Sequence, residues 1–355
     1  MPFSRTQPPE SLCLIRLSAI GDCCHTLPVV RTFQAHWPDT RISWIIGKTE
    51  HALFAGTDGI EFITYDKADP WGSLRRIRHQ VSGRRFPLLL HMHPSMRANL
   101  VSLCVRADLR LGLGGRTNDY QWLFTNARTE PKDRVHVMDR FFGFAEYFGL
   151  GPRELRWDIP VSDADRALAR SLCAGDAPVC VISPCSNPRF RNFRNWRAEN
   201  YAALAAWLRD ERGARIIVTG GPTETERRFG EIIAAAGGEA VTNLVGQTSL
   251  KQLFAIIGEA DLVICPDSGP AHMATAAGTL CVGLYATTNR LRAAPYFCQD
   301  LVVDKYPDAV QREYGKPVEA LRWGTRVRNP AAMDLITLSD VTAKIDQALA
   351  RLGKS

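Results

Sequence analysis

Residues 261–277 read DLVICPDSGPAHMATAA, and this stretch decides the fold. An apolar strand, Asp261 to Cys265, runs through a short turn into a helix of small residues. A helix N-terminus offers unpaired N–H groups and a partial positive charge, and Gly269 lets an anion approach the backbone. The stretch therefore predicts a strand-to-helix turn that binds an anionic group such as a diphosphate.

A second turn of this kind lies upstream, where residues 216–226 read IIVTGGPTETE. Glutamates in a first helical turn complement the helix dipole. Glu224 could instead accept hydrogen bonds from ribose hydroxyls, as an acidic residue does in dinucleotide folds. For the turn in residues 261–277, the simpler alternative is that Asp267 serves only as an N-cap and His272 only as a buried histidine.

Short apolar runs alternate with helical patterns along the whole chain, which predicts an α/β fold with parallel sheets. The predicted strands of the first half are 12–17, 42–46, 62–64 and 88–91, with helices from about Thr26 and through Asn99. Those of the second half are 179–183, 216–219, 240–243, 262–265 and 281–285. The halves are two Rossmann-like domains, residues 1–160 and 161–330, and residues 331–355 hold an amphipathic helix, Asp334 to Leu352, that packs back. Such sheets bind ligands at their carboxyl ends, so two facing sheets make a central cleft.

The composition indicates a globular protein, with 45% hydrophobic and 23% charged residues among 355. No transmembrane segment and no signal sequence is evident, which predicts a cytoplasmic location. The ten cysteines are scattered and include no C-x-x-C pair. We therefore expect reduced, mostly buried thiols.

The positive charge is concentrated in the N-terminal part. Residues 1–150 hold 19 Lys and Arg against 14 Asp and Glu, and the remainder holds 25 against 23. This asymmetry favours an anionic partner for the first half, such as a phosphorylated lipid headgroup or a membrane surface, although a solvated basic face is the simpler explanation. Nucleic acid is disfavoured because no recognisable binding motif accompanies the charge.

The first strand leads into RLSAIGDCCHTLP, residues 16–28. One glycine stands there in place of the three of a dinucleotide fingerprint, which disfavours a nicotinamide oxidoreductase. A carboxylate at the carboxyl end of a strand is placed to act as a general base on an acceptor hydroxyl. Asp22 is that candidate, and the alternative is that it only caps the helix that follows.

Two further loops carry cationic side chains. Residues 183–196, SPCSNPRFRNFRNW, gather arginines after a strand of the second half, where forked donors suit a departing diphosphate. An exposed basic loop is the alternative. In residues 90–99, LHMHPSMRAN, Arg97 could clamp an acceptor phosphate. The spacing of His91 and His93 is only weak evidence for a metal.

In combination, RLSAIGDCCHTLP, RNW, GGPTETE, LVGQTSL and DSGPAHMATAAG resemble the motifs of glycosyltransferase family 9, the bacterial heptosyltransferases of lipopolysaccharide core assembly. The motifs occur in order between about residues 11 and 296. The resemblance implies a GT-B fold, an ADP-heptose donor in the C-terminal half and a phosphorylated lipid A–Kdo acceptor in the N-terminal half. It also implies inversion of configuration without a metal or other cofactor, at the inner face of the bacterial inner membrane, which the chain contacts transiently.

The resemblance also implies a role for individual residues. Asp22 is the base, and Arg194 takes a catalytic and donor-binding position that usually holds lysine. Arg97 likewise replaces a lysine that faces the acceptor. The other donor-binding residues are Ser186, Asn187, Glu224, Asp267, Ser268, Gly269 and His272, and the other acceptor-binding residues are Ser18, Gly21 and His25.

Three alternatives stay open on the sequence alone. The acceptor could be a protein side chain, as in autotransporter heptosylation, or the donor could be another nucleotide sugar. The chain could also bind a nucleotide sugar without turnover. The presence of Asp22 disfavours this alternative, because a noncatalytic binding protein needs no general base.

Overall fold

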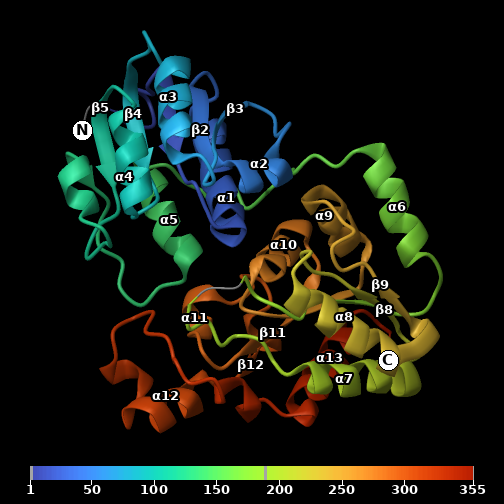
Figure 1. Ribbon diagram of the computed structural model, residues 1–355. Coiled ribbons are helices and arrows are strands. Elements are labelled where there is room, and N and C mark those ends of the chain that lie inside the picture. Colours follow the sequence, from blue (N-terminus) through green and yellow to red (C-terminus); the bar gives the residue numbers. More distant parts are fainter. Residues whose placement is uncertain (1–2, 188–189, 355) are drawn as a thin grey trace. The chain divides into compact units, whose positions relative to one another are not determined.

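The computed structural model describes residues 3–187 and 190–354. The chain forms two compact units, Met1–Pro160 and Val161–Ser355, each built around its own parallel sheet (Figure 1). We call them the first and the second unit. The α/β fold predicted from the alternating pattern is confirmed.

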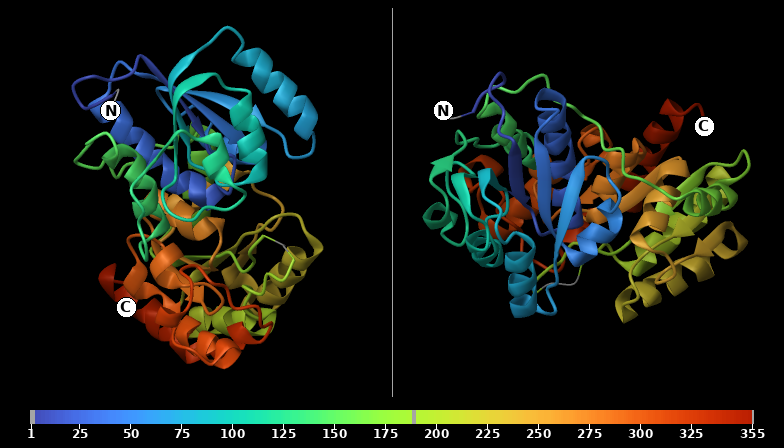
Figure 2. Two further views of the ribbon diagram at one scale, coloured as in Figure 1. Left: turned by 90° about the vertical axis from the view of Figure 1, so that its left-hand side faces the viewer. Right: turned by 90° about the horizontal axis from the view of Figure 1, so that it is seen from above.

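The first unit contains a six-stranded sheet in the order β3-β2-β1-β4-β5-β6. Its central strand β1 is completely buried, which explains why its sequence is a continuous apolar run. Helices α1 and α5 pack together on one face, whereas α3 and α4 cover the other (Figure 2). The strands are β1 (Ser11–Ile15), β2 (Arg41–Gly47), β3 (Ile60–Tyr65), β4 (Phe86–His91), β5 (Ala107–Gly112) and β6 (Ala127–Arg128); the helices are α1 (Ile20–His36), α2 (Lys48–Phe54), α3 (Pro70–Gln80), α4 (Met96–Leu103), the short 3-10 helix η1 (Gln121–Phe124) and α5 (Val137–Glu146).

The second unit repeats this topology with the order β12-β11-β10-β7-β8-β9. The last helix, α13, packs against β11 and α7 of the same unit. The strands are β7 (Val179–Ile182), β8 (Arg215–Val218), β9 (Val241–Asn243), β10 (Leu262–Pro266), β11 (Leu280–Tyr285) and β12 (Val303–Asp304); the main helices are α6 (Asp163–Cys173), α7 (Ala198–Arg212), α8 (Glu224–Gly237), α9 (Leu250–Glu259), α10 (Gly269–Ala277), α12 (Tyr306–Tyr314) and α13 (Leu338–Arg351).

Each sheet reverses its strand order at one point. In the first unit the reversal lies between β1 and β4, and in the second between β7 and β10. Loops that leave the carboxyl ends of two such strands diverge to opposite faces, so a crevice opens between them that commonly binds ligands. Each unit therefore has one place at which a bound ligand is expected.

The start of helix α1 corrects the sequence prediction. The helix begins at Ile20 rather than near Thr26, so Pro28 lies inside it. Proline has no N–H, so the carbonyl four residues earlier loses its helical donor. That carbonyl belongs to Cys24, and it accepts a hydrogen bond of 2.7 Å from the indole Nε1 of Trp157. A distant tryptophan therefore compensates for the proline.

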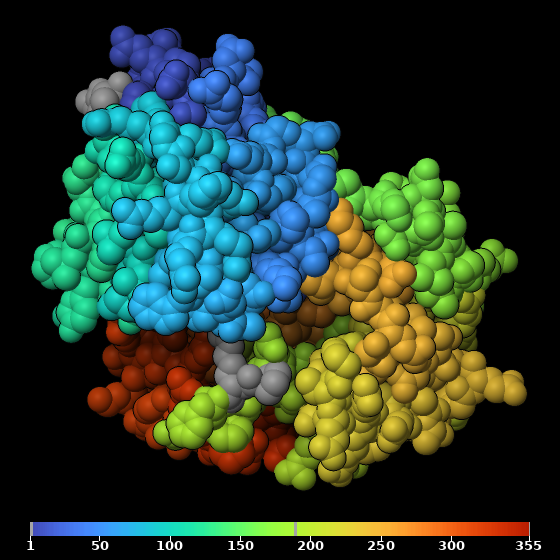
Figure 3. Space-filling view, turned by 45° about the horizontal axis from the view of Figure 1, so that its top comes forward, coloured from blue at the N-terminus to red at the C-terminus, as the bar shows by residue number. Residues whose placement is uncertain are grey.

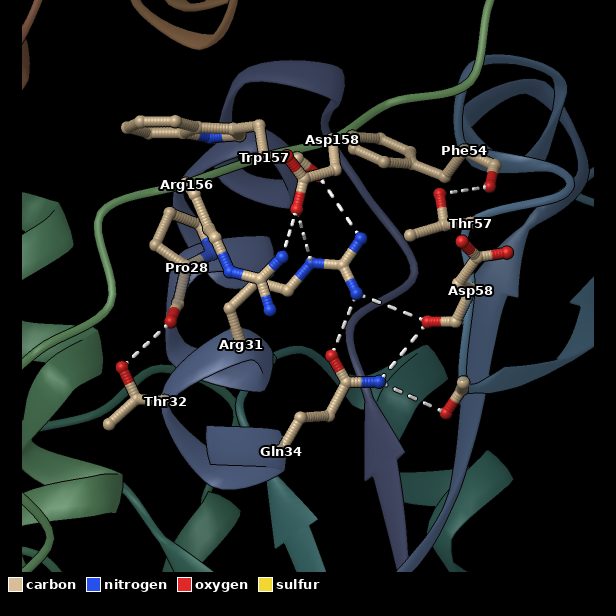
Figure 4. Close-up of polar contacts among 11 residues, drawn as sticks. Pro28, Arg31, Thr32, Gln34, Phe54, Thr57, Asp58, Arg156, Trp157 and Asp158 are labelled. Atoms are coloured by element: carbon tan, nitrogen blue, oxygen red, sulfur yellow. Dashed lines mark hydrogen bonds and ion pairs between the residues drawn. The ribbon is translucent and has the colours of Figure 1, made fainter. Parts of the chain in front are cut away.

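The segment that leads out of the first unit is fastened to this unit as far as Asp158. Arg153 forms ion pairs with Asp139 and Glu146 of α5. Arg31 of α1 lies beneath the segment and donates hydrogen bonds to the Asp58 carbonyl (3.1 Å) and the Gln34 side chain (2.8 Å), while its Nε lies 3.7 Å from the Asp158 carboxylate (Figure 4). Burial lowers the pKa of Arg31.

Arg31 is expected to contribute strongly to stability. Replacing Arg31 with methionine removes a buried guanidinium and leaves the buried Trp157 carbonyl, which accepts a hydrogen bond of 3.4 Å from Arg31, without this donor. We therefore expect the free energy of unfolding to fall by about 2 kcal/mol. Arg156 pairs with the same Asp158 at the surface, so Arg156→Met is the matched control and should cost no more than about 1 kcal/mol. Urea denaturation of both variants checks this, and equal losses would contradict the role given to Arg31.

Candidate functional site

The first candidate site lies at the strand reversal of the first unit. Asp22 is in the first turn of α1, and its carboxylate forms an ion pair with Arg16, which directly follows β1. The Arg16 side chain is 7% exposed, whereas that of Asp22 is 34% exposed. The N-cap residue of α1 is Ala19, so Asp22 is not the N-cap that the alternative required. A buried cation thus orients a carboxylate that remains accessible.

Arg16 is itself held on two further sides. Its Nη1 donates a hydrogen bond of 2.7 Å to the Met92 carbonyl, which follows β4. Its guanidinium lies 4.9 Å from the centre of the Phe141 ring, a cation–π contact. The orientation of Asp22 therefore depends on both strands at the reversal and on α5.

His93 lies beside this pair, at the end of β4. Its Nδ1 accepts a hydrogen bond of 3.2 Å from the Leu17 N–H. Burial, reinforced by the positive charge of Arg16, lowers the pKa of His93 to about 2. The ring is therefore neutral at physiological pH, with its proton on Nε2. A neutral donor near Asp22 could hydrogen-bond a sugar hydroxyl.

His91 is a structural residue. Its Nε2 donates to Asn99 (3.0 Å) and its Nδ1 accepts from Gln121 (3.0 Å), while burial lowers its pKa to about 4. Both ring nitrogens are engaged, so His91 and His93 do not form a metal site together. No cluster of three or more His, Cys, Asp or Glu side chains suited to a metal occurs in residues 3–187 and 190–354.

The other acceptor-binding candidates of the first unit differ in their exposure. Arg97 is exposed in the first turn of α4, and Ser18 is half-buried in the loop before α1. Gly21 is buried. His25 is also buried, with its ring edge-on to His136 at 5.2 Å, in the packing between α1 and α5. Arg97 and Ser18 are therefore the two that present surface to a ligand.

The second candidate site lies at the strand reversal of the second unit. Arg194, from the loop after β7, donates a hydrogen bond of 2.8 Å to the Asp267 carbonyl, and the same nitrogen lies 3.1 Å from the Asp267 carboxylate. Both side chains are nearly buried, at 14% and 12% exposure. The sequence singled out each residue but did not predict that they pair. Arg194 is therefore not part of a solvated basic loop.

Helix α10 begins at this pair without a side-chain cap. Its N-cap is Ser268, which makes no cap hydrogen bond, so Asp267 is not the N-cap that the alternative supposed. The Ser268 hydroxyl is buried and has no hydrogen-bond partner in the described residues. Gly269 opens the helix, and His272 is buried in its first turn. Uncapped N–H groups and an unused hydroxyl are what an anion needs for binding.

The loop after β7 is ordered around Ser186. Its backbone N–H and hydroxyl both donate to Asn195, at 2.8 and 3.0 Å, and the hydroxyl accepts from Asn192 at 2.9 Å. Asn187 is exposed, and its carbonyl accepts from Asn192. Ser186 thus shapes the loop that carries Arg194, and Asn187 is the more accessible of the two.

The two glutamates at the start of α8 have different environments. Glu226 accepts hydrogen bonds from the Gly221 N–H (2.8 Å) and the Thr223 hydroxyl (2.6 Å), so it stabilises the turn. Glu224 is exposed on the same first turn. Its carboxylate is therefore the one available to a ligand.

Sequence reasoning missed two side chains at the first site. Arg16 is an arginine directly after a buried strand, which is a detectable signal because so buried a cation needs a partner. His93 was considered only as a metal ligand. Its contact with Leu17 spans 76 positions in the sequence and follows only from the pairing of β1 with β4.

Comparisons with known proteins identify the family and the fold. The profile of glycosyltransferase family 9 (heptosyltransferase) matches residues 74–321. The chain is 38% identical, over 96% of its length and 97% of the relative's, to the lipopolysaccharide core heptosyltransferase OpsX of Haemophilus influenzae. Among solved structures it resembles a family 9 glycosyl transferase from Veillonella parvula (TM-score 0.76, 17% identity, 96% and 97% of the two chains covered). It also resembles the E. coli ADP-heptose lps heptosyltransferase II (TM-score 0.71, 19% identity, 97% and 99% covered). The GT-B fold is thereby confirmed, and the chain belongs to glycosyltransferase family 9, the heptosyltransferases.

Proposed function

We propose that this heptosyltransferase transfers heptose from ADP-heptose to a sugar hydroxyl of the lipopolysaccharide inner core, on Kdo-lipid A or heptosyl-Kdo-lipid A. The observation that carries the proposal is the accessible Asp22 carboxylate held by buried Arg16 at the strand reversal. A protein that only bound a nucleotide sugar would have no use for an oriented base in its other unit. The similarity to OpsX, a lipopolysaccharide core heptosyltransferase, supports lipopolysaccharide core as the acceptor.

The reaction is a single displacement that inverts the anomeric carbon. Asp22 takes the proton from the acceptor hydroxyl, whose oxygen attacks the anomeric carbon as the bond to the diphosphate breaks, and ADP leaves. Arg194 and the N–H groups of α10 stabilise the negative charge that grows on the leaving diphosphate. With charge neutralised in this way, the reaction needs no metal or other cofactor.

The remaining donor contacts follow from the same arrangement. Asn187 and Ser186 lie in the loop that would face the phosphates, and Ser268, Gly269 and His272 belong to the start of α10. Glu224 would accept hydrogen bonds from the ribose hydroxyls. On the acceptor side, Arg97 would pair with a phosphate and Ser18 would contact the sugar, while Gly21 and His25 would shape that site from within.

The test is release of ADP from purified protein that is given ADP-heptose, with and without deacylated Kdo-lipid A. Release that depends on the acceptor supports the proposal. Binding of ADP-heptose without release would point to a protein acceptor or to a binder without turnover. No binding of ADP-heptose would point to another nucleotide sugar.

Glu224 and Glu226 should respond differently to substitution. Glu224→Gln is expected to raise the KM for ADP-heptose about tenfold, since it weakens hydrogen bonds to the ribose, and to leave stability unchanged. Glu226→Gln is the matched control. It should lower the free energy of unfolding by about 1 kcal/mol through the weakened turn, with a smaller effect on KM. The reverse pattern in steady-state kinetics and urea denaturation would transfer the ribose role to Glu226.

We further propose that the protein works as a peripheral protein at the inner face of the inner membrane. None of the helices in the described parts of the chain is long and apolar enough to cross a bilayer. All ten cysteines are free thiols, and burial raises the pKa of Cys13 to about 12. A reducing compartment suits such thiols.

A further inference from the structure

Exposed apolar side chains gather on one face of the first unit. Thirteen large hydrophobic side chains are exposed among the described residues, and seven of them lie between residues 71 and 123, at 40–71% exposure. They come from α3, α4 and the η1 turn: Trp71, Met96, Leu100, Leu103, Tyr120, Trp122 and Leu123. We call this set the α3–α4–η1 face. Residues 71–124, cyan to teal, form a continuous surface of the first unit in Figure 3.

Helix α4 presents two faces. Met96, Leu100 and Leu103 recur at the spacing of a helical stripe and point outward, whereas Ala98 and Val101 are fully buried. A helix that covers a sheet needs only the second stripe. The side chains of the outer stripe are 40–65% exposed, so much of their apolar surface faces solvent.

The η1 turn is fastened beside α4. The Asp119 carboxylate accepts the Met96 N–H (2.9 Å), and the Asp119 carbonyl accepts from the Asn99 side chain (2.6 Å). Asp119 and Tyr120 both have φ of 53°, a backbone conformation that non-glycine residues rarely adopt and that persists only where the surroundings fix it. The η1 turn is therefore fixed in place, and it holds the side chains of Tyr120, Trp122 and Leu123 outward.

The charge of this region is strongly positive. Residues 71–128 contain ten arginines and no lysine against two aspartates, a net charge of +8, whereas the whole chain carries +7. Three of these arginines, Arg76, Arg84 and Arg85, form ion pairs with acidic side chains of the protein. Others are exposed and form no ion pair within the described residues, among them Arg75, Arg78, Arg97, Arg106, Arg116 and Arg128.

We propose that the α3–α4–η1 face docks on an anionic lipid bilayer. Trp and Tyr with aliphatic neighbours enter the headgroup region, and each arginine near an anionic surface adds attraction. Nucleic acid fits less well because Leu and Met side chains do not stack on bases as aromatic rings do. The proposal rests on the proposed function, since a lipid-anchored acceptor is presented at such a surface. Arg97, in the first turn of α4, joins the face to the acceptor site.

The experiment is co-sedimentation of the full chain with vesicles of phosphatidylcholine, with and without phosphatidylglycerol. We expect binding that requires phosphatidylglycerol and weakens with salt. Leu103→Ser, Trp122→Ser and Leu123→Ser combined should weaken it about tenfold or more. Arg75→Glu, Arg78→Glu and Arg106→Glu combined should do the same. The controls are Leu291→Ser with Phe297→Ser, and Arg166→Glu with Arg312→Glu, all exposed in the second unit.

A second measurement separates this proposal from the enzymatic one. The two face variants should release ADP with the soluble deacylated acceptor at the parent rate, which also shows that they are folded. The docking proposal would be overturned if the parent protein did not bind the vesicles, or if the face variants bound them as tightly as the parent. Neither result would affect the proposed transferase function. A third outcome would also overturn the docking proposal, in favour of nucleic acid. In it, only the arginine variant loses vesicle binding, and the parent protein binds an oligonucleotide as tightly as it binds the vesicles.

Discussion

Replacing Asp22 with asparagine is expected to lower the rate of acceptor-dependent ADP release by about 10²–10⁴-fold, because the amide cannot take the hydroxyl proton. ADP-heptose affinity should change little, since the donor is assigned to the second unit. The amide has nearly the shape of the carboxylate but lacks the charge that pairs with buried Arg16, so urea denaturation must show that Asp22→Asn is folded before a loss of turnover is assigned to the missing base. Single-turnover kinetics and equilibrium binding of ADP-heptose measure the two quantities separately.

Two further variants sharpen this test. Asp39 is exposed in the same unit, and Asp39→Asn should leave turnover unchanged. Arg16→Met removes the cation that orients Asp22 and should lower turnover by a smaller factor than Asp22→Asn, because the base remains but is less well placed. An Asp22→Asn enzyme that works at the parent rate would remove the base assignment, whatever Arg16→Met does.

The sheets were predictable wherever a strand is buried on both faces. Strands such as β1 and β10 read as uninterrupted apolar runs, so period and length identify them. Strand β5 was missed because Asp108 and Arg110 interrupt its sequence. Arg110 is tolerated there because its guanidinium donates to the carbonyls of Ser102 (2.8 Å) and Val105 (3.0 Å). Strands β6 and β12 have two residues each, which is too short for any periodicity.

The candidate sites were predictable as residues but not as contacts. Asp22 and Asp267 stand at strand ends, a position that sequence patterns reveal. The partner of Asp267 is Arg194, 73 positions earlier. Their pairing depends on β7 lying next to β10, which a strand order settles and a local pattern does not.

Arg194→Ala is expected to weaken ADP-heptose binding and turnover together, with a combined loss in kcat/KM of about 10²–10³-fold. A cation that meets the diphosphate in the bound donor and still more strongly in the leaving group affects both quantities. Arg197, three residues further on, is exposed and paired with Asp334, and Arg197→Ala should change neither. Steady-state kinetics with ADP-heptose as the varied substrate provides the comparison.

The pairing of Arg194 with Asp267 gives this loss a second possible cause. Arg194→Ala also leaves a nearly buried carboxylate without its cation, which should lower the free energy of unfolding by about 3 kcal/mol. Combining it with Asp267→Asn removes the unpaired charge and should restore much of that stability. If Arg194 acts on the diphosphate, the double variant stays as slow as Arg194→Ala. Turnover that recovers along with stability would mean instead that Arg194 serves only to neutralise Asp267. The N–H groups of α10 would then be the groups that stabilise the negative charge of the leaving diphosphate.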